Sequence, residues 1–138
     1  MSLDYWKREA SRWLDDASED LRVAESLLKN AHYAASCFYS QQAAEKALKA
    51  ALYSNRVEAR GHSILELLES LERVRNSELK GFYDDARLLD KHYAPPRYPN
   101  LHPSVYLPSY KLYSKEDAER CIKSAKKILE SMKKSLKS

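Results

Sequence analysis

Apolar residues recur every three or four positions along three long stretches of the chain. In residues 3–29 they are Trp6, Ala10, Trp13, Ala17, Leu21, Ala24 and Leu28. Residues 31–54 repeat this spacing with many alanines, and residues after Ser114 repeat it again up to Leu136. Such spacing places apolar side chains on one face of an α-helix. The pattern therefore predicts three long amphipathic helices.

Two shorter stretches lie between the second and third long ones. Leucines three apart predict a helix over about 62–74, and apolar steps of three and four predict another over about 78–91. Ser114, with Asp117 three residues later, has the capping-box pattern and marks the start of the last helix. The prediction is an all-α fold, an up-and-down bundle of four or five helices.

The segment at about 93–113 interrupts this pattern. All five prolines of the chain lie in residues 92–113, so no helix can run through, and five of the ten tyrosines lie there too. Long loops in compact domains are usually functional or disordered, and disordered segments are poor in aromatic residues. We expect a loop that packs on the bundle, within a single domain that covers residues 1–138.

Charge and composition narrow the function. The net charge is +4, and residues 121–138 contain six lysines and one acidic residue. The basic excess therefore lies in the last helix, where it suits either attraction of RNA, DNA or an acidic partner, or a solvated helix end. With two glycines in the whole chain there is no glycine-rich phosphate loop, and we expect no cofactor.

The two cysteines, Cys37 and Cys121, lie among apolar residues of predicted helices. Without a CxxC or Cys/His ligand spacing, we expect two small buried side chains and no metal site. Charges interrupt the amino terminus at once, which is unlike a signal peptide, and no uncharged stretch is suited to span a bilayer. We expect a cytoplasmic protein without a membrane association.

Arg87 and His92 are the candidates for chemistry. An imidazole titrates near pH ~6.5 and can exchange protons, while a guanidinium donates in a fork that matches phosphate oxygens. Together they suit RNA cleavage without a metal, by attack of a 2′-hydroxyl on the adjacent phosphate. Five helical steps place the two side chains apart, so either the helix unwinds at His92 or two copies meet in a dimer.

Two polar residues, Gln41 and Glu45, lie on or beside the apolar stripe of the second helix. A buried carboxylate without partners is costly. We therefore expect Arg, Lys, Tyr or backbone donors from another helix to hold Glu45.

Three segments, residues 37–50, 61–68 and 86–100, together resemble the HEPN family in content, order and separation. The resemblance implies a bundle similar to the substrate-binding helical domain of kanamycin-type nucleotidyltransferases, a homodimer, and a partner that is a minimal nucleotidyltransferase. Many such proteins are ribonucleases, several are toxins of toxin–antitoxin pairs, and their signature of Arg, four to six residues, then His is met by Arg87 and His92. Leu88 and Ala94 stand where some of these toxins carry a polar residue and a tyrosine.

Two functions remain open from the sequence. In the first, the protein is a metal-independent ribonuclease or RNA-binding toxin component, with His92 as general acid/base, Arg87 as phosphate clamp and auxiliary contacts nearby. In the second, it is a non-catalytic subunit that binds a nucleotide or substrate for a nucleotidyltransferase; a purely structural interaction domain is the third alternative. The auxiliary or binding residues are Tyr93, Arg97, Tyr98, Gln41 and Glu45.

Overall fold

Five α-helices make up most of the computed structural model, which describes residues 1–101 and 107–137. They are α1 (Leu3–Lys29), α2 (Tyr33–Ser54), α3 (Ile64–Arg75), α4 (Tyr83–Asp90) and α5 (Lys115–Lys137). The all-α prediction is confirmed. Within the described part of the chain, no helix is both long and apolar enough to cross a membrane.

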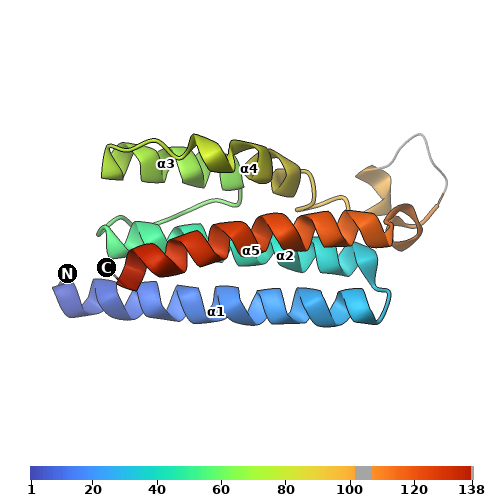
Figure 1. The fold of residues 1–138 in the computed structure, drawn as a ribbon, viewed down its shortest axis with the longest axis horizontal. Helices are drawn as coiled ribbons and strands as arrows, with labels where there is room; N and C mark the ends of the chain where they lie inside the picture. Colours follow the sequence, from blue (N-terminus) through green and yellow to red (C-terminus); the bar gives the residue numbers. More distant parts are fainter. Residues whose placement is uncertain (102–106, 138) are drawn as a thin grey trace.

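The helices form layers around α2 and α5 (Figure 1). α1 lies on one side of this pair, and the shorter α3 and α4 lie on the other. The connection between α4 and α5 projects at one end of the bundle, opposite the end where both termini lie (Figure 1). The predicted loop therefore lies at one end of the bundle, beside the amino-terminal end of α2.

Helix α2 is the centre of the core. Most of its side chains are buried, and its alanines let α1 and α5 approach closely. Leu48 and Leu52 are almost completely buried among side chains of the other helices. Truncating either to alanine is expected to cost ~2–5 kcal/mol, because a cavity would remain.

Three predicted helix boundaries are wrong by a few residues, each for a local reason. α2 starts at Tyr33, since Ala31 adopts a positive φ of 62° that ends the preceding turn. α3 starts after Ser63, whose hydroxyl accepts a hydrogen bond from the Glu66 amide at 3.2 Å. α4 starts at Tyr83, after a 3₁₀ turn at Lys80–Phe82, and not near residue 78.

The segment that we predicted as a packed loop contains two short 3₁₀ turns, Pro99–Leu101 and Ser109–Leu112. Pro96 and Ser109 are buried, so the described parts pack on the bundle at these residues, whereas residues 97–101 are exposed. Residues 102–106, in the middle of the predicted loop, lie outside the described residues.

The capping box at the start of α5 is confirmed: the Asp117 amide donates to the Ser114 hydroxyl at 3.1 Å, and the Ser114 amide donates to the Asp117 carboxylate at 2.8 Å.

Candidate functional site

The site is built where α4 ends. Its last residue, Asp90, accepts hydrogen bonds from the Ser63 hydroxyl at 3.0 Å and the Leu65 amide at 3.1 Å. A carboxylate at the amino terminus of a helix satisfies free amides and favours the helix dipole. Asp90 thus ties α4 to the start of α3 and fixes the backbone from which His92 and Tyr93 leave the helix.

His92 lies two residues beyond α4 and turns toward the bundle. Its Nδ1 is 3.0 Å from the Tyr113 hydroxyl, and the two rings meet edge to face at 5.4 Å. On its other side lie Cys37 of α2 and Cys121 of α5, both fully buried. A hydrogen bond between the thiols lowers the pKa of Cys121 and raises that of Cys37.

Arg87 lies on the exposed side of α4, away from this group. It forms an ion pair with Asp84 at 3.1 Å and lies over the Tyr83 ring at 5.7 Å. Among the described residues, no hydrogen bond or ion pair joins Arg87 to His92. The helix does end before His92, as one of the two predicted geometries required, but a single chain does not bring the two side chains together.

The Arg97 side chain packs against several aromatic rings. Its guanidinium lies over the rings of Phe38, Tyr93 and Tyr98, at 4.4, 4.8 and 5.0 Å from their centroids. Its Nε also donates to the Tyr93 carbonyl at 3.1 Å, which fixes the plane of the group. Arg97 and Tyr98 are exposed, and Phe38 and Tyr93 are half-buried. This cluster, here called the Arg97 surface, therefore combines a positive charge with one exposed and two partly accessible aromatic rings.

Tyr93 connects the Arg97 surface to a polar network on α2. Its ring stacks on His62 at 4.7 Å with an interplanar angle of 18°, and the His62 Nδ1 is 3.1 Å from a Glu45 oxygen. Lys49 donates to the other Glu45 oxygen at 3.1 Å, and the Gln41 amide donates to the His62 carbonyl at 2.9 Å. Glu45 is therefore buried and partnered.

The prediction for Glu45 was right about burial and about a lysine donor, but wrong about its origin. Lys49 lies one turn along the same helix, and His62 lies in the connection before α3. Helical spacing indicated that Glu45 faces inward. It could not indicate that the chain after α2 folds back over it.

A hollow of about 260 Å³ opens beside this network, lined by His62, Ser63, Asp90 and Tyr93. A hollow of about 470 Å³ lies over α1 and Tyr53, but none of the predicted site residues lines it. Of the predicted site residues, Tyr93 lines the 260 Å³ hollow, and Arg87 and His92 do not. Sequence reasoning missed Phe38 and Asp90 as parts of this region, and the separation of Cys37 and Cys121 along the chain gave no sign that they meet.

Comparison with known proteins agrees with this fold. The pattern of the HEPN domain matches residues 10–136, and the chain belongs to the HEPN family. It is 35% identical over 134 residues to the protein named "Putative toxin MJ1304" of Methanocaldococcus jannaschii, across 93% of this chain and 88% of that one.

Two solved structures are similar over almost their whole length. TT1696 from Thermus thermophilus is 37% identical, with a TM-score of 0.86 over 91% of this chain and 97% of that one. ST0689, described as an archaeal HEPN homologue, is 34% identical, with a TM-score of 0.77 over 93% of this chain and 98% of that one.

Proposed function

We propose that this chain is the RNA-directed component of a toxin–antitoxin type module whose partner is a minimal nucleotidyltransferase, and that it binds single-stranded RNA on the Arg97 surface. The observation that carries the proposal is the guanidinium of Arg97 held over three aromatic rings at one end of the bundle. The name of the M. jannaschii relative supports the toxin role.

The chemistry of the Arg97 surface suits unpaired bases. Proteins bind single-stranded nucleic acid by stacking bases on aromatic or guanidinium planes beside a positive charge. Tyr98 and Arg97 offer such planes to solvent, and the hollow beside Tyr93 and His62 offers room for a base or a phosphate. Tyr93 belongs both to the Arg97 surface and to the lining of the hollow, so one strand can contact the two together.

Cleavage of the bound RNA is the second part of the proposal. His92 would exchange protons and Arg87 would bind the phosphate, without a metal in the reaction. Because His92 is turned toward the cysteines and Arg87 faces outward, the two meet only across a pair of chains or after the imidazole rotates outward.

We also propose a homodimer, which would provide the first of these two arrangements. Light scattering at micromolar concentration should return about twice the 16.0 kDa mass of the chain. A mass near that of one chain, measured together with RNA cleavage, would contradict the composite arrangement.

Titration of a fluorescent single-stranded RNA tests the binding proposal. Arg97→Ala should weaken binding by ~5- to 150-fold, the equivalent of ~1–3 kcal/mol for a lost stacking contact. Arg8→Ala is the matched control, because Arg8 is an exposed arginine on α1 that pairs with Asp4. Equal weakening by both changes would show unspecific charge attraction.

The alternative, a non-catalytic subunit that binds a nucleotide or substrate for the nucleotidyltransferase, uses the same surface. The hollow beside Tyr93, His62 and Asp90 is the observation in its favour. Tight binding of a mononucleotide, with no gain for a longer RNA and no cleavage, would favour this subunit over the RNA-directed component.

A further inference from the structure

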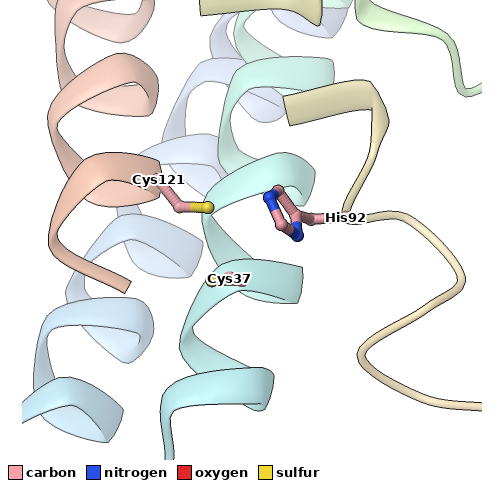
Figure 2. A group of neighbouring side chains, drawn as sticks. All are labelled: Cys37, His92 and Cys121. Atoms are coloured by element: carbon pink, nitrogen blue, oxygen red, sulfur yellow. The ribbon is translucent and has the colours of Figure 1, made fainter. Parts of the chain in front are cut away.

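Three side chains with metal-binding atoms meet between α2, α5 and the end of α4. They are Cys37, His92 and Cys121, and the two sulfurs and an imidazole nitrogen all lie within 4.8 Å of one another. Figure 2 shows the Cys121 sulfur and a ring nitrogen of His92 directed at each other, with Cys37 beside them. Each of the three comes from a different part of the chain.

Helix packing and one hydrogen bond hold these atoms close to one another. Cys37 and Cys121 are fully buried on two helices that pack against each other along the core. The Tyr113 hydroxyl engages Nδ1 of His92 at 3.0 Å, which leaves Nε2 for the sulfurs. A histidine that ligates a metal through one nitrogen typically has its other nitrogen held by such a hydrogen bond.

We propose that Cys37, His92 and Cys121 bind one zinc ion. Thiolate and imidazole are the ligands that zinc prefers, with Zn–S bonds of ~2.3 Å and Zn–N bonds of ~2.0 Å. A tetrahedral ion with such bonds keeps its sulfurs ~3.8 Å apart. The ligand atoms, already within 4.8 Å, need to close by no more than ~1.3 Å, which side-chain torsions of cysteine and histidine allow.

Charge balance favours this ion at a buried place. Two thiolates, a neutral imidazole and a divalent cation sum to zero, so the loaded site has no uncompensated charge. His92 is only half-buried and offers the side from which an ion can enter. Three protein ligands leave a fourth tetrahedral position for water or another small ligand.

The zinc site and the proposed cleavage make different demands on His92. A nitrogen that ligates zinc cannot exchange a proton with RNA, so a loaded chain would cleave slowly and a chelator would restore the rate. Metal binding itself does not depend on RNA, and it can be measured on the protein alone.

The test uses the full chain, reduced, stripped with a chelator and then dialysed. Titration with Zn²⁺ against a chromophoric competitor should give one ion per chain, and titration with Co²⁺ should give an intense near-ultraviolet thiolate-to-cobalt band. Cys37→Ala and Cys121→Ala should each weaken zinc binding by more than ~100-fold, because each removes a ligand. Tyr113→Phe removes only the hydrogen-bond partner of His92 and should weaken zinc binding by ~10- to 100-fold. His32→Gln, at an exposed histidine before α2, should change nothing.

Two results would overturn the proposal. One is wild-type protein, folded by circular dichroism, that develops no thiolate-to-cobalt band with one equivalent of Co²⁺; this result needs no variant to fold. The other is His32→Gln lowering zinc affinity as much as Cys121→Ala, which would place the ion on surface histidines. Neither result bears on RNA binding by the Arg97 surface.

Discussion

Two positively charged regions of this protein differ in how their charge is held. The lysines of α5 up to Lys134 are numerous and exposed, and Lys127 is neutralised in part by Asp85 at 2.8 Å. Arg97 is one charge, but three aromatic rings and a backbone carbonyl fix it in place. Flexible solvated charge attracts any polyanion at long range, whereas a fixed charge beside rings can select unpaired bases.

The largest expected effect concerns cleavage near the Arg97 surface. If the protein cleaves single-stranded RNA in the presence of EDTA, His92→Ala should lower the rate by ~10²- to 10⁴-fold, the usual contribution of a general acid or base. Arg87→Lys should also lower the cleavage rate, because lysine keeps the charge but lacks the bidentate fork of the guanidinium. Analysis of the products for a 2′,3′-cyclic phosphate checks the reaction.

Cleavage that survives His92→Ala would point to a contaminating nuclease. Lys134→Ala is the control in α5, since Lys134 is exposed and lies about three and a half turns along the helix from Cys121, the α5 residue beside His92. It should retain the wild-type rate.

The network under Tyr93 is expected to matter for stability. Glu45→Ala strands Lys49 and frees His62, and should lower the free energy of unfolding by ~1–3 kcal/mol. It should also weaken RNA binding, because the ring stack of His62 on Tyr93 loses its support. Denaturant unfolding measures the first effect, and Glu19→Ala, at an exposed pair on α1, is the control.

An unchanged free energy of unfolding in Glu45→Ala would show that the carboxylate is not part of a stabilising network. It would also mean that Glu45 and His62 do not hold the Tyr93 ring under Arg97, and the contrast between a fixed Arg97 and the solvated lysines of α5 would be weakened.

A smaller effect is expected at the junction of α3 and α4. Asp90→Ala removes the cap of α3 and should cost ~0.5–2 kcal/mol of stability, with a shift in the position of His92 and Tyr93. Asp84→Ala removes a fully exposed carboxylate from the same helix and should stay within ~0.5 kcal/mol of the wild type. Equal losses in thermal unfolding would contradict the capping role.

The smallest effect is expected in α5. Lys126→Gln and Lys133→Gln remove exposed charges. Neither lysine is among the described cations that lie over an aromatic ring. Single-stranded RNA should bind both variants within about twofold of the wild type, and the salt dependence should stay the same. A direct phosphate contact would instead lower the salt slope by about 1 for each lysine removed.

Helical spacing was enough to predict the bundle, because α1 and α5 each bury one apolar face and α2 buries most of its side chains against them. Helix ends were less predictable, since partners distant in sequence determine them, as Asp90 does for α3. The inward position of Glu45 followed from spacing, but its bond to His62 depends on how the connection after α2 folds back. The meeting of Cys37 with Cys121 could not be predicted, because 83 intervening residues and the packing of α2 on α5 determine it.

Photo-crosslinking of a 4-thiouridine-labelled single-stranded RNA tests the central claim most directly. Since trypsin cleaves after Lys91 and Arg97, the Arg97 surface is represented by the peptide of residues 92–97. We predict that the RNA adduct lies on this peptide and on the one that begins at Tyr98, and that Arg97→Ala removes it. Adducts confined to the lysine-rich peptides of α5 would contradict the account, because they would show that charge alone determines where RNA binds.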